Sequence, residues 1–172
     1  MSTFTNICVV WPKGMTGIAS TFVAELDGTS LWLGYLGKGG AHAELRVKGF
    51  TPIESGESYS ERMAQDALGS KIGNAVGGVI MDKYRQEIEA NLELYNQGGR
   101  GTLDQHKKTR TIPLSDISKV ELTTKTGMNS PPALKGSPGP YLSCKLGGKT
   151  HIFFEIPSSE HSMTDMLPLM GG

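Results

Sequence analysis

The stretch STFVAELDGTSLWLGYL, residues 20–36, decides how this chain folds. Two runs of strand-forming residues, Ser20–Leu26 and Ser30–Leu36, flank Asp27-Gly28, a dipeptide that favours a tight hairpin turn. In the second run both alternating sets of side chains are largely apolar. That pattern predicts a strand well inside a sheet, with both of its faces covered.

Further strands are predicted on both sides of this hairpin. Before it, Thr3–Trp11 is rich in β-branched and aromatic residues, and after it Ala43–Lys48 alternates apolar with charged side chains. The second half of the chain carries four more runs of strand character: Thr109–Ile112, Ile117–Lys125, Tyr141–Leu146 and Thr150–Ile156. The last two form a hairpin around Gly147-Gly148-Lys149.

Between these groups of strands the period of the apolar residues changes from two to four. The four-residue repeat consists of Leu68, Ile72, Val76, Ile80, Tyr84, Ile88 and Leu92. It predicts one helix, or two in tandem, over Glu61–Tyr95, within a helical insertion at about residues 59–96. A short C-terminal helix is predicted to begin at Ser158 or Ser159, with its end near Pro168.

The second group of strands resembles the pleckstrin-homology-like superfamily, in particular domains of the GRAM type. The resemblance is carried by Thr111–Leu122, with its Ile-Pro-Leu run, by Pro140–Leu146, and by the Phe-rich His151–Ile156. It implies a single α+β domain over residues 1–172, a mostly antiparallel β-sandwich or barrel. Domains of this superfamily bind phosphoinositides, peptides or other proteins, and very few are enzymes, so the resemblance implies a binding role.

Composition excludes some classes of function. Lysine and arginine number 17, as do aspartate and glutamate, so the basic excess that nucleic-acid binding requires is absent. The N-terminus has no basic lead followed by an apolar block, and the longest apolar stretch, Ile72–Met81, is about half a membrane span. We therefore expect a cytoplasmic protein.

Motifs for catalysis or metal binding are not found in the sequence. Gly148-Lys149-Thr150 lacks the glycine of a phosphate-cradling loop, since Ser143 stands in its place, and His42 replaces the third glycine of a dinucleotide fingerprint. The four histidines are scattered, and Cys8 and Cys144 are expected to be half-buried thiols in strands. We expect no cofactor, and an enzyme with a site built from distant residues is the minority hypothesis.

Three glycines, Gly69, Gly73 and Gly77, share one face of the predicted helix. Each costs a helix about 1 kcal/mol relative to alanine, so close approach of another backbone is the expected compensation. The partner is this chain's own sheet or second helix, the same helix in a second copy of the protein, or a membrane.

The basic cluster at residues 106–110 has two interpretations. If it continues a strand, Lys107 faces away from Lys108 and Arg110, and only the latter two converge on an anion. A solvated strand edge is the favoured interpretation, and an anion or lipid site that also uses Lys13 and Lys38 is the other.

The sequence thus predicts a non-catalytic binding or scaffolding module. Self-association through the glycine-faced helix would give a homodimer. Peripheral binding to anionic lipid head groups is the alternative, and an enzyme is the third hypothesis.

Overall fold

The computed structural model describes residues 4–12, 20–38, 73–123, 141–155 and 163–171. The strand expected at Ala43–Lys48, and the part of the helical insertion before Gly73, lie outside the described residues. Seven strands form one antiparallel sheet: β1 (Phe4–Pro12), β2 (Ser20–Leu26), β3 (Ser30–Lys38), β4 (Arg110–Pro113), β5 (Ile117–Thr123), β6 (Tyr141–Leu146) and β7 (Lys149–Glu155). The α+β class and the hairpins β2–β3 and β6–β7 are confirmed.

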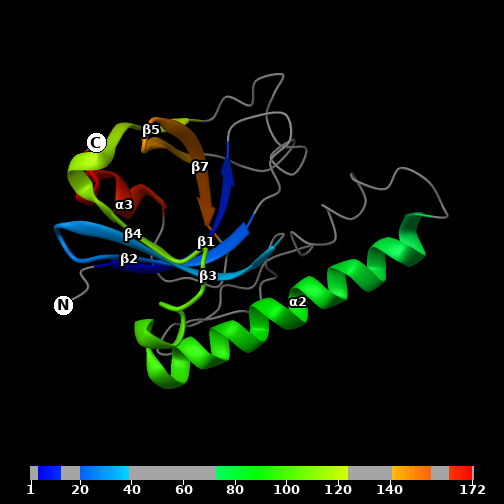
Figure 1. Ribbon diagram of the computed structural model, residues 1–172. Coiled ribbons are helices and arrows are strands. Elements are labelled where there is room, and N and C mark those ends of the chain that lie inside the picture. The colour runs from blue at the N-terminus through cyan, green and yellow to red at the C-terminus, as the bar shows by residue number, and fades with distance from the viewer. Residues whose placement is uncertain (1–3, 13–19, 39–72, 124–140, 156–162, 172) are drawn as a thin grey trace.

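The order of the strands makes the sheet a half-barrel. It runs β4-β3-β2-β1-β7-β6-β5, so two strands that follow each other in the chain, β4 and β5, lie at opposite edges. They are joined only by a short 3-10 turn, Leu114–Asp116. Because three residues reach no more than about 10 Å, the sheet has to curl until its two edges approach at this corner (Figure 1).

The β2–β3 turn shows why the hairpin forms at Asp27. Its carboxylate accepts hydrogen bonds from the backbone N–H groups of Thr29 and Ser30, at 3.0 and 2.8 Å, and from both hydroxyls, each at 2.9 Å. These bonds hold the pKa of Asp27 well below its usual range. Gly28 supplies the positive φ, +88°, that the turn needs.

Alternation along the strands gives the sheet two apolar faces. The inner cluster takes side chains from all seven described strands, including Cys8, Phe22 and Phe153, and is closed by Met166 and Met170 of the C-terminal segment. The outer cluster joins Ile7, Val9, Val23, Trp32 and Leu36 of the sheet to Ile88 and Leu92. The prediction that both faces of the β3 strand are covered is confirmed.

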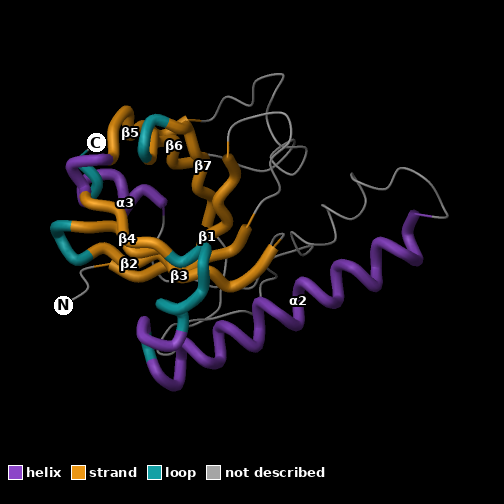
Figure 2. The backbone as a smooth tube through the Cα atoms, viewed as in Figure 1, coloured by secondary structure: helices purple, strands orange, loops and turns teal. Residues whose placement is uncertain are grey.

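Two helices cover the sheet from opposite sides (Figure 2). The helix α2 (Gly73–Gly98) is continuous, which answers for its described part the question of one helix or two, and it packs against β3. The helix α3 (Met163–Leu169) packs against β5, β6 and β7, and contains Pro168 within its last turn. Proline was expected to end this helix, and it lies one residue before the end.

A polar seam fixes the end of α2 to the outer face of the sheet. Glu25, 6% exposed, accepts hydrogen bonds from the Tyr95 hydroxyl at 2.6 Å and from Arg100 Nε at 2.9 Å. Next to it Trp32 stacks on Tyr95 and donates from Nε1 to Asp104 at 2.9 Å. Both partners of the buried carboxylate therefore come from α2 and the turn after it.

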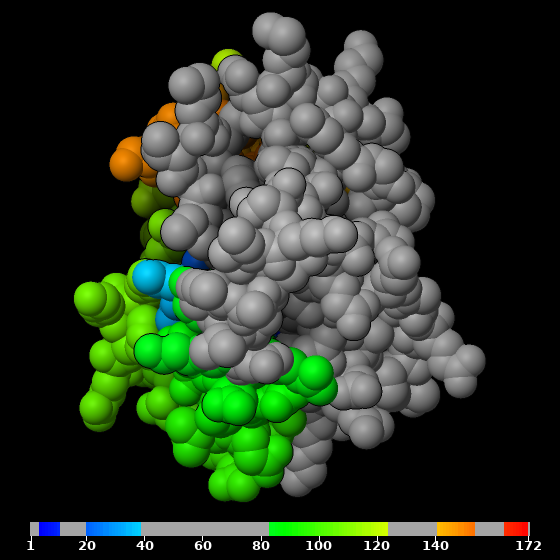
Figure 3. All heavy atoms as spheres, turned by 90° about the vertical axis from the view of Figure 1, so that its right-hand side faces the viewer, coloured from blue at the N-terminus to red at the C-terminus, as the bar shows by residue number. Residues whose placement is uncertain are grey.

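Gly37 lets α2 approach β3 closely. A β-bulge leaves Leu36 unpaired opposite β2, and a Cβ built on Gly37 would lie 2.5 Å from Ile88 Cγ1. In the space-filling view, atoms at the end of β3 directly meet those of α2 (Figure 3). Glycine at this position is thus a packing requirement.

We expect Gly37→Ala to destabilise the protein by about 1–3 kcal/mol, because the added methyl group overlaps Ile88. In an Ile88→Ala background the same change should cost less than about 0.5 kcal/mol. Urea unfolding of the four proteins measures this coupling. Gly101→Ala is the control, since a Cβ there meets nothing within 4 Å; equal costs at Gly37 and Gly101 would contradict the described packing.

Candidate functional site

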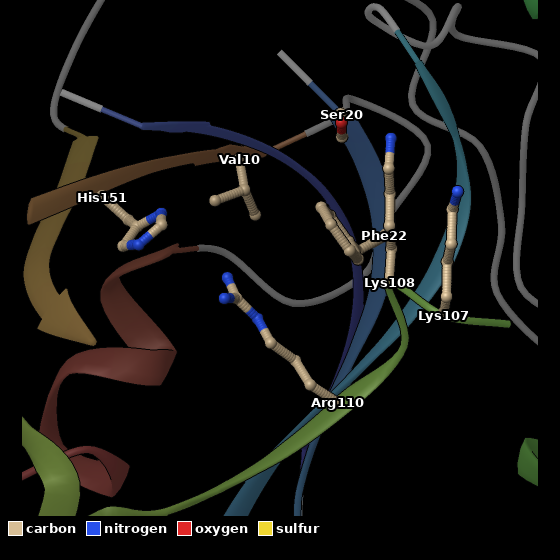
Figure 4. Close-up of a pocket in the computed structure, with 7 residues that line it drawn as sticks. All are labelled: Val10, Ser20, Phe22, Lys107, Lys108, Arg110 and His151. Atoms are coloured by element: carbon tan, nitrogen blue, oxygen red, sulfur yellow. The ribbon is translucent and has the colours of Figure 1, made fainter. Parts of the chain in front are cut away.

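A basic hollow lies at one end of the half-barrel, where β1 ends and β2, β4 and β7 begin (Figure 4). Its volume is about 360 Å³. The described residues that line it are Val10, Ser20, Phe22, Lys107, Lys108, Arg110 and His151. Three of these side chains are cationic and none is a carboxylate, so the hollow concentrates positive charge on a chain whose formal net charge is zero.

The segment before β4 is held in place by Tyr35. The ring of His106 stacks on Tyr35 with centroids 4.3 Å apart, and Lys108 Nζ lies 4.6 Å from the centroid of the same ring. The Tyr35 backbone N–H donates to Thr109 Oγ1 at 3.1 Å. These contacts hold residues 106–109 in a turn. Of the basic residues in this segment, only Arg110 belongs to the strand that follows.

This turn corrects the expected direction of Lys107. Strand alternation would have turned it away from Lys108 and Arg110, but Lys107 and Lys108 precede the strand, so alternation does not apply to them. All three cations line the same hollow. Figure 4 shows Lys107 and Lys108 extending in the same direction, while the Arg110 guanidinium points toward His151.

No described carboxylate forms an ion pair with these three cations. Partial burial lowers the pKa of Arg110, yet a guanidinium keeps its charge at any pH at which proteins fold. Cations held together without an internal counter-charge repel one another. An anion in the hollow would relieve this repulsion and accept charge-assisted hydrogen bonds from the cations nearest to it.

The other predicted site residues are not part of the described hollow. Lys38 is the exposed last residue of β3, and its register partner Ser20, rather than Lys38 itself, lines the hollow. Lys13 and Gly69 lie outside the described residues. Gly73 is the first residue of α2 and Gly77 follows one turn later.

Sequence reasoning missed His151, which forms the far end of the hollow. It is only 8% exposed, and within the described part of the chain its Nδ1 has no hydrogen-bond partner. Burial, followed by the charges of Arg110 and Lys149, lowers the pKa of His151 to about 4. The imidazole is therefore neutral at pH 7.

We expect His151 to make the protein less stable in mild acid. The unfolded chain binds a proton at this histidine below about pH 6.5, whereas the folded protein resists protonation until about pH 4. The contribution of His151 to the unfolding free energy is therefore fully present above pH 6.5. It is lost as the pH falls toward 4, by about 3 kcal/mol in total.

Chemical unfolding of wild type and His151→Gln at pH 7, 5.5 and 4.5 measures the contribution of His151 to the unfolding free energy. The difference in unfolding free energy between the two proteins should shrink as the pH falls. A difference that does not change with pH would contradict a buried neutral imidazole.

Both cysteines are packing residues. Cys8 and Cys144 are free thiols, 0% and 1% exposed, in β1 and β6, so they are fully buried rather than half-buried as expected. Burial raises the pKa of Cys144 to about 12 and that of Cys8 further still. Neither thiol is available as a nucleophile.

Within the described residues, no three histidine, cysteine or acidic side chains gather in a group that could hold a metal ion. None of the described helices has the length and apolar character needed to cross a membrane. No protein-family model matches this chain, and neither a curated protein nor a solved structure matches it.

Proposed function

We propose that this chain is a non-catalytic binding module of the pleckstrin-homology-like type, and that the basic hollow holds an oxyanion of the phosphate or sulfate class. The observation that carries the proposal is the gathering of Lys107, Lys108 and Arg110 around one hollow without a described counter-charge. The superfamily assignment is supported by the antiparallel half-barrel with a helix at its C-terminal end, and by the Ile-Pro-Leu run that joins β4 to β5.

The hollow also offers neutral hydrogen-bond donors. The Ser20 hydroxyl and the His151 ring border it together with the cations. A tetrahedral oxyanion has several oxygens that each need hydrogen-bond donors. The hollow offers donors from β2, β4, β7 and the turn before β4, so it suits a tetrahedral oxyanion better than it suits a planar carboxylate.

Isothermal titration calorimetry with inorganic phosphate and with sulfate tests the proposal. We expect saturable 1:1 binding with a dissociation constant on the order of 1 mM, which corresponds to about 4 kcal/mol. It should weaken as the salt concentration rises. No saturable binding of either anion, together with no binding to phosphoinositide vesicles, would overturn the proposal.

Vesicles separate the two sources of such an anion. The protein is mixed with vesicles of phosphatidylcholine, with and without a phosphoinositide, and sedimented at two salt concentrations. Salt-sensitive binding to phosphoinositide vesicles assigns the oxyanion to a lipid head group, the peripheral-membrane alternative. Binding of free phosphate with no vesicle binding assigns it to a soluble ligand. Self-association through Gly69, Gly73 and Gly77 stays a prediction.

A further inference from the structure

His151 is placed where a change in its charge would affect an anion in the hollow. It lies on the inner face of β7, two residues before the core residue Phe153, and Figure 4 shows its ring at the end of the hollow toward which Arg110 points. A buried polar side chain with an unpartnered nitrogen is uncommon, because the missing hydrogen bond costs about 1–3 kcal/mol. In the described part of the chain, His151 Nδ1 is such an atom.

Among the described residues, the titratable side chains that line the hollow beside this ring are all cationic. From β4 comes Arg110, from the turn before it Lys107 and Lys108, and from β7 itself Lys149. The register partner on β6 is Cys144, a buried thiol that stays protonated. On β1 the partner is Pro12, which does not titrate, and α3, which packs against β7, carries the exposed Asp165.

We infer that the hollow takes up a proton together with its anion, and that His151 is the group that receives the proton. This inference rests on the proposed oxyanion site and adds its regulation. Without an anion, the surrounding cations and burial keep the ring neutral. With an anion in the hollow, the nearest charge to the ring becomes negative, and the protonated ring gains a charge-assisted partner.

The sign of the pH dependence follows from linkage. An opposite charge within about 4–6 Å raises the pKa of a histidine by 1–3 units. The pKa of the free ring is about 4, so binding at pH 5–6 is accompanied by proton uptake from solvent, whereas binding at pH 7.5 is accompanied by little. Affinity for the anion therefore rises as the pH falls, by roughly tenfold between pH 7.5 and 5.

Sulfate is the probe, because its charge does not change between pH 5 and 8, whereas that of phosphate does. Calorimetric titrations of wild type at pH 7.5, 6.5 and 5.5 give the affinity. Repeating the pH 5.5 titration in two buffers with different ionisation enthalpies gives the number of protons taken up for each sulfate bound. We expect a several-fold tighter dissociation constant at pH 5.5 and a clear fraction of one proton taken up.

His151→Gln is the matched variant, because it keeps a polar side chain of similar reach and cannot titrate. It should bind sulfate with the same dissociation constant at pH 7.5 and at pH 5.5, because glutamine takes up no proton. If this variant does not fold, the proton-uptake measurement on wild type still tests the inference.

The outcomes are distinguishable from those of the proposed function. Saturable sulfate binding to wild type without proton uptake, and with equal affinity at pH 5.5 and 7.5, overturns the role of His151 and leaves the oxyanion site intact. A pH dependence that survives unchanged in folded His151→Gln likewise overturns it. Absence of sulfate binding at every pH overturns the role of His151, and together with absence of phosphate and vesicle binding it overturns the oxyanion site as well.

Discussion

Replacing Lys108 and Arg110 together by glutamate should abolish binding of phosphate and sulfate, with a loss of at least about 100-fold in affinity. Each hydrogen bond from a charged group contributes about 1.5–3 kcal/mol, and 2.8 kcal/mol already corresponds to a factor of 100. The double variant removes two of the three cations of the hollow and adds two like charges to repel the anion. Calorimetry at constant ionic strength measures the loss.

The control must change the net charge of the protein by the same amount. Lys83→Glu/Lys119→Glu does so at two exposed lysines, one on α2 and one on β5, neither of which lines the hollow. This control should keep affinity within about threefold of wild type. Equal losses in the two double variants would show that overall charge, and not the hollow, binds the anion.

Lys108 also contacts the ring of Tyr35, so the first variant needs a test of folding. Thermal unfolding should shift by only a few degrees, because a partly exposed cation–π contact contributes about 0.5–1 kcal/mol. Lys108→Gln/Arg110→Gln, which removes the charges without reversing them, should still weaken binding by about tenfold or more.

Leu92→Ala should destabilise the protein by about 2–5 kcal/mol, which lowers its melting temperature by roughly 10 °C for a chain of this size. Leu92 is 4% exposed and belongs to the outer apolar cluster between α2 and the sheet. Its loss leaves a cavity at the contact with β3, the strand against which α2 packs.

Leu94→Ala, two residues along the same helix, is the matched control. It is the same chemical change at the same helix propensity, but Leu94 is 48% exposed. We expect a change of less than about 0.5 kcal/mol in urea unfolding. Similar costs for Leu92→Ala and Leu94→Ala would mean that α2 does not rest on the sheet through the face described.

The local elements of the fold could be predicted because their signals are local. Asp27-Gly28 forms its turn through hydrogen bonds to Thr29 and Ser30, and the four-residue spacing of Ile88 and Leu92 places both on the side of α2 that meets the sheet. The order of the strands could not be predicted. Alternation tells which side chains share a face, but not that β1 pairs with β7, whose partner residues lie more than a hundred positions away.

The candidate site was only half visible in the sequence for the same reason. Lys108 and Arg110 were singled out because they are adjacent to other basic residues, whereas Ser20 and His151 reach the hollow from strands far away in the chain. One signal could have identified His151. It occupies an inner position of a strand two residues before Phe153, and a polar residue at a position that the pattern reserves for the core suggests a special role.

The most direct test of the oxyanion site is an NMR titration of the ¹⁵N-labelled protein with sulfate. We expect saturable shifts of the amide signals of Ser20, His151 and residues 107–110, all with one dissociation constant, and none at Glu25 or Arg100 in the polar seam on the outer face. Shifts that grow linearly without saturation, or that spread over exposed lysines such as Lys83 instead of the hollow, would contradict the account.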